Sequence, residues 1–298
     1  MLPRIGVLDL NTHKSLDSAV EEFGEVVECA RSAELYGFDR YWVGQHYLPD
    51  DLWGDSIAPI ALLLASTTSI RIGAGAILLR QNSVVQLASA FRFLGSIFPG
   101  RVDLAVARAV PSHAASRERL EGELIPSPFE QRCIWLKALL ADFESIAPWT
   151  HSVPDLWIVG SGTQSADVAR KIGARYVHSH LHRAVPSLDA GDWPPEPEAV
   201  ATFVICEESD ATARDAEAEC RMSEWQVIVS GSPKTCVDQI CALAEQTRAA
   251  EVLLAFAGRR TRWPVAMRRI SSELAARRSL APPHSPDPDP TRSTYFKI

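Results

Sequence analysis

The sequence predicts an α/β fold, a single-domain (β/α)8 or TIM barrel in which eight parallel strands and their helices close into a ring. Short apolar runs alternate with longer amphipathic runs along most of the chain, as repeated βα units require. Eight short runs can be counted, nearly all followed by a helical pattern, which favours a closed barrel over an open doubly wound sheet. The length of 298 residues accommodates such a barrel, which typically needs about 250.

The first half of the chain supplies four strands and the helices between them. Apolar residues recur at helical spacing after Ser15, the expected N-cap of the first helix, until Gly37 ends it. Pro99 and Gly100 end the third helix in the same way. In chain order we expect a strand at 5–10, the helix ending at Gly37, a strand at 38–43, a helix at 57–66, a strand at 70–79, a helix at 84–97 and a strand at 102–107.

The second half continues the alternation and completes the eight strands. It contains two Pro-rich stretches, a loop at 186–198 and a segment at 281–298 that lacks the apolar residues needed to offset ordering entropy. We therefore expect residues 1–280 to form the barrel and residues 281–298 to be a flexible tail. The elements are a helix at 129–143, a strand at 156–159, a helix at 164–172 closed by Gly173, strands at 175–178 and 200–206, helices at 211–222 and 233–244, a strand at 252–256 and a helix at 264–280.

Composition and charge exclude several classes of function. The formal net charge of −7 argues against nucleic-acid binding, which needs a cluster of uncompensated Lys and Arg. We see no signal peptide and no apolar run long enough to span a membrane, so we expect a soluble cytoplasmic protein. The six cysteines show no CxxC pair and are expected to be reduced, mostly buried thiols.

The strongest candidate binding site lies after the fifth strand, where polar residues of a (β/α)8 barrel gather. Residues 160–165, Gly-Ser-Gly-Thr-Gln-Ser, lead directly into a helix. Small residues let backbone N–H groups approach an anion, and the helix N-terminus adds partial positive charge. Arg108, at the neighbouring strand end, could complete a phosphate site. The alternative is an ordinary N-cap with no ligand.

Histidines follow the second and sixth strands. His46 could serve as an acid or base if it faces the pocket, or could be a hydrogen-bonded structural residue. His178, His180 and His182 alternate along an extended segment, so their rings could point to one side as metal ligands. This pattern favours a rival function, that of a metal-dependent hydrolase. The ligand set is incomplete, however, because the candidate carboxylates lie at the beginnings of strands, at the opposite end of the barrel. We therefore expect no metal. Those carboxylates are Asp103, Asp155 and Glu251.

Several stretches together resemble the bacterial luciferase-like monooxygenases (alkanal monooxygenase-like), flavin or deazaflavin enzymes built on a (β/α)8 barrel. The matching stretches run in order and spacing over most of residues 3–275. They are Ala-Glu-Leu-Tyr-Gly-Phe-Asp-Arg-Tyr-Trp-Val at 33–43 with His46, Thr-Ser-Ile-Arg-Ile-Gly-Ala-Gly-Ala-Ile-Leu-Leu at 68–79, Phe-Pro-Gly-Arg-Val-Asp-Leu at 98–104, Leu-Trp-Ile-Val-Gly-Ser-Gly at 156–162, and Gly-Ser-Pro-Lys-Thr at 231–235.

The resemblance implies a role for each candidate residue. His46 takes the position of the family's active-site histidine and is expected to be catalytic. Gly75 and Ala76 take the position of the family's non-prolyl cis peptide against the flavin ring. The residues expected to hold the flavin phosphate are Arg108, Gly160, Ser161, Gly162, Thr163 and Ser165.

The implied function is a flavin-dependent monooxygenase that uses reduced FMN and O2, through a flavin peroxide, to oxygenate a small organic substrate. Since no dinucleotide-binding fingerprint is present, we expect a separate NAD(P)H:flavin reductase to supply the reduced flavin. The resemblance also implies a homodimer.

The departures from the family pattern leave alternatives open. The family commonly has Glu-His-His where this chain has Gln45-His46-Tyr47, and luciferase's reactive cysteine falls at Ala107. One alternative is a deazaflavin (F420)-dependent hydride-transfer enzyme on the same barrel. The other is a flavin-binding barrel that has lost catalysis.

Overall fold

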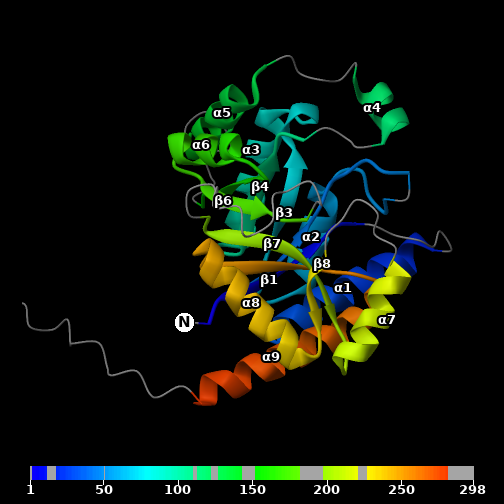
Figure 1. Cartoon of the computed structure of the whole chain (residues 1–298). Helices are drawn as coiled ribbons and strands as arrows, with labels where there is room; N and C mark the ends of the chain where they lie inside the picture. Colours follow the sequence, from blue (N-terminus) through cyan, green and yellow to red (C-terminus); the bar gives the residue numbers. More distant parts are fainter. Residues whose placement is uncertain are drawn as a thin grey trace, which may run out of the picture.

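Eight parallel strands close into a ring with helices around it (Figure 1), which confirms the predicted (β/α)8 barrel. The computed structural model describes residues 2–11, 18–49, 51–109, 113–121, 127–142, 152–181, 197–220 and 227–280. Pairing of the first strand with the last closes the ring. The eight strands, in ring order, are β1 (Arg4–Asp9), β2 (Arg40–Val43), β3 (Arg71–Leu78), β4 (Val102–Ala107), β5 (Asp155–Gly160), β6 (Arg175–Ser179), β7 (Ala199–Cys206) and β9 (Glu251–Phe256).

A ninth strand, β8 (Val227–Gly231), was not predicted from the sequence. Strand β9 pairs with one edge of β7 from Ala199 to Val204. The other edge is shared: β6 pairs with residues 199–201 of β7, and β8 pairs with residues 203–206. β8 is therefore an addition to the ring beside the C-terminal half of β7. Its short apolar run Val-Ile-Val was overlooked because eight other runs already completed a barrel.

The helices follow the predicted order, and Figure 1 shows α3, α5 and α6 on one side of the strands and α1, α8 and α9 on the other. The polar helix α4 was missed because it carries no apolar stripe. The helices are α1 (Ala19–Leu35), α2 (Ile57–Ser66), α3 (Val84–Ile97), α4 (Ala114–Glu121), α5 (Phe129–Ala141), α6 (Thr163–Ile172), α7 (Asp210–Cys220), α8 (Pro233–Thr247) and α9 (Trp263–Leu280), with short 3-10 turns η1 (Leu79–Gln81) and η3 (Arg260–Arg262).

The expected cap of the first helix was wrong. Ser18, not Ser15, is the N-cap of α1, and its hydroxyl accepts a hydrogen bond from the N–H of Glu21 at 3.3 Å. A capping side chain reaches that N–H only from the position directly before the first helical residue. The predicted end is confirmed, since Gly37, which follows the C-cap residue Tyr36, has a φ of +73°.

Large apolar side chains fill the barrel interior. Trp42 and Trp157 meet edge to face with ring centroids 5.3 Å apart, and Leu8 packs in the same cluster. A second, larger apolar cluster lies between the strands and the surrounding helices. The six cysteines are free thiols and four are buried.

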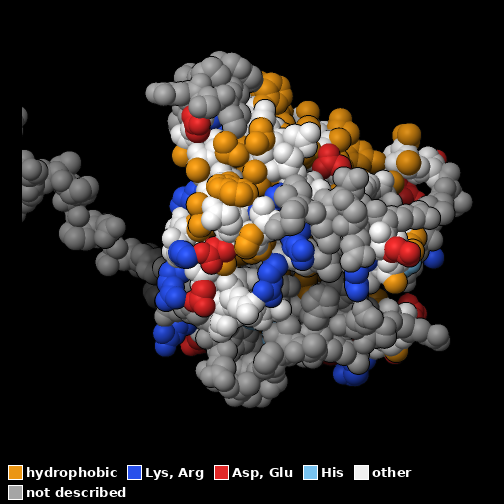
Figure 2. Space-filling model, turned by 90° about the horizontal axis from the view of Figure 1, so that it is seen from above, with side chains coloured by type: hydrophobic (Ala, Val, Ile, Leu, Met, Phe, Trp, Pro, Cys, Tyr) orange, Lys and Arg blue, Asp and Glu red, His pale blue; other side chains and the backbone are white. Residues whose placement is uncertain are grey.

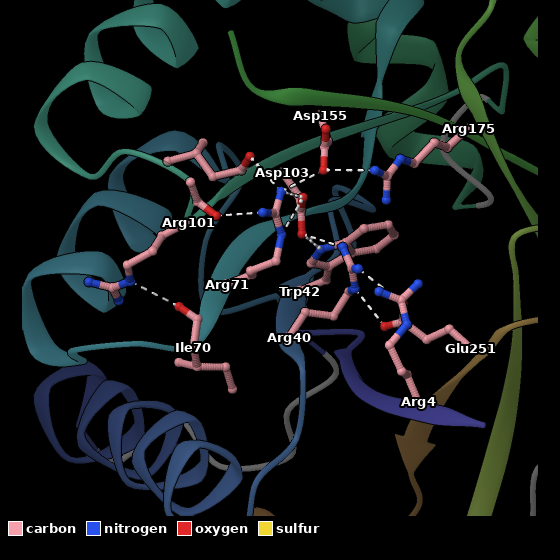
Figure 3. Close-up of polar contacts among 12 residues, drawn as sticks. Arg4, Arg40, Trp42, Ile70, Arg71, Arg101, Asp103, Asp155, Arg175 and Glu251 are labelled. Carbon is pink, nitrogen blue, oxygen red and sulfur yellow. Dashed lines mark hydrogen bonds and ion pairs between the residues drawn. The ribbon is translucent and has the colours of Figure 1, made fainter. Parts of the chain in front are cut away.

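Charged side chains close the end of the barrel at which the strands begin (Figure 3). Buried Arg40 donates to Glu251 at 2.5 Å and to Asp103 at 2.6 Å. Arg71 reaches both Asp103 and Asp155, the latter at 2.8 Å. The three carboxylates therefore lie at the end opposite the expected site, as predicted, and they are ion-paired with arginines rather than available as metal ligands there.

Two predicted segments fall wholly or largely outside the described residues. They are the tail at 281–298 and most of the loop at 186–198. Among the helices that are described, none has both the length and the apolar character needed to cross a membrane.

Candidate functional site

The predicted site residues all lie at the end of the barrel where the strands finish, which is the functional end of this fold. They come from β2, β3, β4 and β5, which are consecutive in the ring. Strands spaced about 4.8 Å apart place the first and last of these roughly 14 Å from each other. His46 follows β2, Gly75 and Ala76 lie in β3, Arg108 follows β4, and Gly160, Ser161, Gly162, Thr163 and Ser165 form the end of β5 and the start of α6.

The end of β5 forms a tight turn into α6. The N-cap of α6 is Gly162, so no side-chain oxygen caps the helix. A Cβ atom at Gly160 would collide with the hydroxyl of buried Ser165, so this close turn needs glycine. An uncapped helix N-terminus presents backbone N–H groups and partial positive charge, an arrangement suited to an anion. Glycine is itself a permitted N-cap, so the alternative of an N-cap that holds no ligand stays open at this turn.

Arg108 lies beside this turn. Its guanidinium donates to the side-chain oxygen of Gln164 in the first turn of α6. The exposed arginine and the helix start line a cavity of about 410 Å³ between α5 and α6. A permanent positive charge therefore lies next to the N-terminal turn of α6. The residues lining the cavity are Arg108, Phe129, Glu130, Gln164, Ser165, Asp167, Val168 and Lys171.

The peptide bond between Gly75 and Ala76 is cis, which the resemblance implied. The ladder between β3 and β4 shifts its register between Ala74 and Ile77. A Cβ atom at Gly75 would lie 2.8 Å from both Leu8 and Trp42, so the backbone here presses against the barrel interior. Next to it, Ala76, Ala107 and Val159 are partly exposed. They give the barrel rim, the end at which the strands finish, a small apolar lining.

His46 lies over the end of β2. A Cβ atom at Gly44 would meet the Cε1 atom of the His46 ring at 2.8 Å. The same point is 3.4 Å from the backbone of both Asp9 and Leu10 at the end of β1. The half-buried imidazole is therefore held close to the rim, where it can act as a proton donor or acceptor.

Gln45 connects the loop that carries His46 to the end of β3. Its side-chain oxygen accepts from the Leu78 N–H at 3.0 Å, and its side-chain N–H groups donate to the Gly54 carbonyl at 3.0 Å and the Tyr47 hydroxyl at 3.1 Å. Asn82 also donates to Gln45, at 3.2 Å. Two donated bonds need an amide, because a carboxylate has no N–H to give. The departure from the family's glutamate therefore has a local structural reason.

His178 lies in β6 and points away from the barrel interior, and His180 follows the strand. His178 lies on the same side of β6 as Tyr176, which packs in the cluster between strands and helices, while Val177 packs inside the barrel. The His178 and His180 rings are 6.0 Å apart, and His182 lies outside the described residues. Among the residues that are described, no group of three or more potential ligands could hold a metal ion.

Sequence reasoning missed two residues at this site. Asn82 and Tyr176 both contact residues of the predicted set or their neighbours, through Gln45 and Gly160 respectively. Tyr176 sits at an alternating strand position that usually indicates packing only. No sequence signal separates such a tyrosine from a core residue, because its contact depends on the register between β5 and β6.

The family model described as luciferase-like monooxygenase matches residues 3–133. The protein YwcH of Bacillus subtilis is 29% identical over 240 residues, covering 72% of this chain and 71% of that protein. The N-acetyl-S-alkylcysteine monooxygenase of the same organism is also 29% identical, covering 60% of this chain and 57% of that protein. The match therefore spans little more than half the length of that enzyme.

Solved structures share the fold along nearly the whole chain. Apo-MsnO8 superposes with a TM-score of 0.78 at 23% identity, covering 92% of this chain and 98% of that one. The oxygenating constituent of 3,6-diketocamphane monooxygenase from Pseudomonas putida, solved with FMN, gives a TM-score of 0.68 at 15% identity and coverages of 92% and 98%. The F420-dependent tetrahydromethanopterin reductase of Methanopyrus kandleri gives 0.64 at 14% identity and coverages of 93% and 99%.

Proposed function

Because this chain belongs to the luciferase-like monooxygenase family, we propose that it is a monooxygenase that binds reduced FMN at the barrel rim and oxygenates a small organic substrate with O2. The observation that supports the proposal is that an apolar rim and a glycine-rich turn into a helix lie on neighbouring strand ends, β3 to β5. When bound, the reduced flavin would supply the reactivity toward O2. The protein would position the reactants and exclude water from the pocket.

The residues present fit a flavin mononucleotide. A planar ring needs a flat, apolar surface, and the partly exposed side chains of Ala76, Ala107 and Val159 offer one. Ala76 and Val159 pack against the cluster that contains the buried Trp42. A phosphate needs cationic and N–H donors, and Arg108 with the uncapped start of α6 supplies both. The apolar surface and the phosphate donors lie on neighbouring strand ends, as the ring and the phosphate of one flavin mononucleotide require.

Each group then has a task. Arg108, Ser161, Gly162 and Thr163 would bind the phosphate, with Gly160 and Ser165 shaping the turn, and Gly75 and Ala76 would support the ring. An imidazole nitrogen of His46 would donate or accept the proton that moves when the substrate is oxygenated. An imidazole is suited to this, because its two ring nitrogens can donate and accept a proton.

A deazaflavin-dependent hydride transfer is the second candidate. It is favoured by the likeness to the F420-dependent reductase, and the same phosphate turn and rim would serve a deazaflavin.

The thioether-type substrate in the name of the N-acetyl-S-alkylcysteine monooxygenase is a sensible first probe for an oxygenation reaction. We further propose that a separate NAD(P)H:flavin reductase supplies the reduced cofactor.

We also propose that the chain forms a homodimer through α2 and α3. Among their exposed residues neither helix has Lys, Arg, Asp or Glu, and α3 exposes Val85, Phe93 and Ile97 by about half each. Figure 2, seen from the side of α3 and α5, shows hydrophobic side chains gathered over part of the surface. Two chains of net charge −7 repel each other, so an uncharged apolar face is where a second copy approaches at least electrostatic cost.

The test is an anaerobic titration of the purified chain with reduced FMN and, separately, with reduced F420, followed by mixing with oxygenated buffer. Preferential binding of FMN and oxygenation of an added thioether, ketone or aldehyde would support the monooxygenase. Preference for F420 without an oxygen reaction would replace it with the hydride-transfer function. Binding of FMN with no turnover of any substrate would favour a non-catalytic flavin-binding barrel.

A further inference from the structure

Tyr176 reaches across from β6 to the first residue of the phosphate turn. Its hydroxyl donates a hydrogen bond to the carbonyl oxygen of Gly160 at 2.9 Å. Gly160 is the last residue of β5 and directly precedes Ser161. Tyr176 is 4% exposed, so the contact is formed inside the protein and not at a mobile surface.

This contact fixes the orientation of the peptide that opens the turn. In a trans peptide the C=O and the following N–H point in opposite directions, and the described residues contain a single cis bond, at Gly75–Ala76. With the Gly160 carbonyl directed at Tyr176, the N–H of Ser161 points away from β6. Strand β5 lies between β6 and β4 in the ring, so this N–H faces the side of β4, where Arg108 follows.

His178 determines how the tyrosine proton is used. Its Nδ1 atom lies 3.1 Å from the Tyr176 hydroxyl oxygen. The hydroxyl has one proton, and the Gly160 carbonyl can only accept, so Nδ1 carries a proton and donates to Tyr176. Burial, with a smaller contribution from His180, lowers the pKa of His178 to about 4, and burial raises the pKa of Tyr176. At neutral pH the imidazole of His178 is therefore neutral and the phenol of Tyr176 is protonated. The two hydrogen bonds then run in one direction, from His178 to Tyr176 and from Tyr176 to Gly160.

We propose that Tyr176, oriented by His178, is a positioning residue that turns the Ser161 N–H toward an anion held by Arg108, and so sets the affinity for the phosphate of the cofactor. The proposal rests on the function proposed above. It assigns to two buried side chains on the outer face of the barrel an effect on a ligand that neither touches.

The test compares reduced FMN with reduced riboflavin, which has the same ring and no phosphate. Tyr176→Phe removes the hydroxyl and keeps the ring that packs between strands and helices. Losing one positioned hydrogen bond should weaken FMN binding by about tenfold and change riboflavin binding by less than about twofold. Unchanged riboflavin binding shows in the same protein that the barrel rim is intact.

Tyr41→Phe is the matched control. Tyr41 is likewise buried in a strand, and its hydroxyl donates to Asp9 at 2.7 Å, away from the turn. It should leave the ratio of the FMN and riboflavin affinities at the wild-type value. If Tyr176→Phe also keeps that ratio, the positioning role is wrong and the proposed function stands. If the wild-type chain binds FMN no more tightly than riboflavin, no phosphate is held and both proposals fall.

Discussion

The side-chain oxygen of Gln45 accepts a hydrogen bond from the backbone N–H of Leu78 at 3.0 Å. This bond joins the loop that carries His46 to the strand that carries Gly75 and Ala76. Gln45 is 1% exposed, and all its donors and acceptors are used within the protein. The relative placement of the histidine and the β3 backbone therefore depends on one buried amide.

Replacing that amide with a carboxylate should be costly. Gln45→Glu puts a group without N–H donors against the Gly54 carbonyl, and unpaired buried polar groups cost about 1–3 kcal/mol. We expect urea unfolding to show a loss of this size. Gln246→Glu makes the same change on the exposed face of α8 and should alter the free energy of unfolding by less than about 0.5 kcal/mol. Equal effects of the two changes would show that the Gln45 amide is not required.

Glu34 should make the fold sensitive to acid. Burial alone would raise its pKa, but hydrogen bonds from the N–H groups of Ile70, Ser69 and Thr68 outweigh this and hold the pKa at about 2, below the ordinary value of 4.5. A carboxyl with a depressed pKa in the folded state stabilises fully above its unfolded pKa and loses this as pH falls through the folded one. We therefore expect wild type to lose stability between pH 4.5 and 2.

Glu34→Gln isolates that contribution, since its amide oxygen can still accept but does not titrate. The variant should be less stable than wild type at pH 7, and the gap should close as pH falls toward 2. Chemical unfolding at a series of pH values measures both. A gap that stays constant with pH would show that the charge of Glu34 contributes nothing.

His46 should act on turnover and not on cofactor affinity. Replacing it with Asn removes the imidazole that would donate or accept the proton, and loss of general acid–base catalysis typically costs about 10²–10⁴-fold in rate. Single-turnover product yield with reduced FMN and O2 should fall accordingly, while the Kd for reduced FMN stays within about twofold. Unchanged product formation would remove His46 from the mechanism.

The uncharged face of α3 should hold the dimer together. Phe93 is 47% exposed, and Phe93→Asp places two like charges in an isologous contact, so we expect the variant to sediment as a monomer of 32.7 kDa. Val20→Asp, at an 84% exposed apolar residue of α1, should leave the mass unchanged. A monomeric wild-type chain would contradict the proposed interface.

Periodicity and turn residues predicted all eight ring strands, because most of these strands bury both faces and appear as continuous apolar runs. They did not reveal β8, whose apolar run was overlooked because eight other runs already completed a barrel, or α4, which has no apolar stripe. The cap of α1 was misplaced because Ser15 and Ser18 offer the same chemistry, and the exact start of a helix depends on packing.

The candidate site was predictable to the level of strand ends. Residues such as Arg108 and Ser161 were found because they follow strands directly. The contacts of Gln45 with Leu78 and of Tyr176 with Gly160 join residues 33 and 16 positions apart. Such contacts depend on strand register and side-chain direction, which a single sequence does not reveal.

The most direct test of the account is the affinity for reduced FMN and for reduced riboflavin, measured anaerobically with wild type, Arg108→Ala and, as a control, Arg170→Ala. Arg170 is an exposed arginine in the last turn of α6 that pairs with Asp167. We predict that wild type and the control bind FMN more than about tenfold more tightly than riboflavin, and that Arg108→Ala loses most of this preference. Equal affinity of wild type for the two flavins, or binding of neither, would contradict the account.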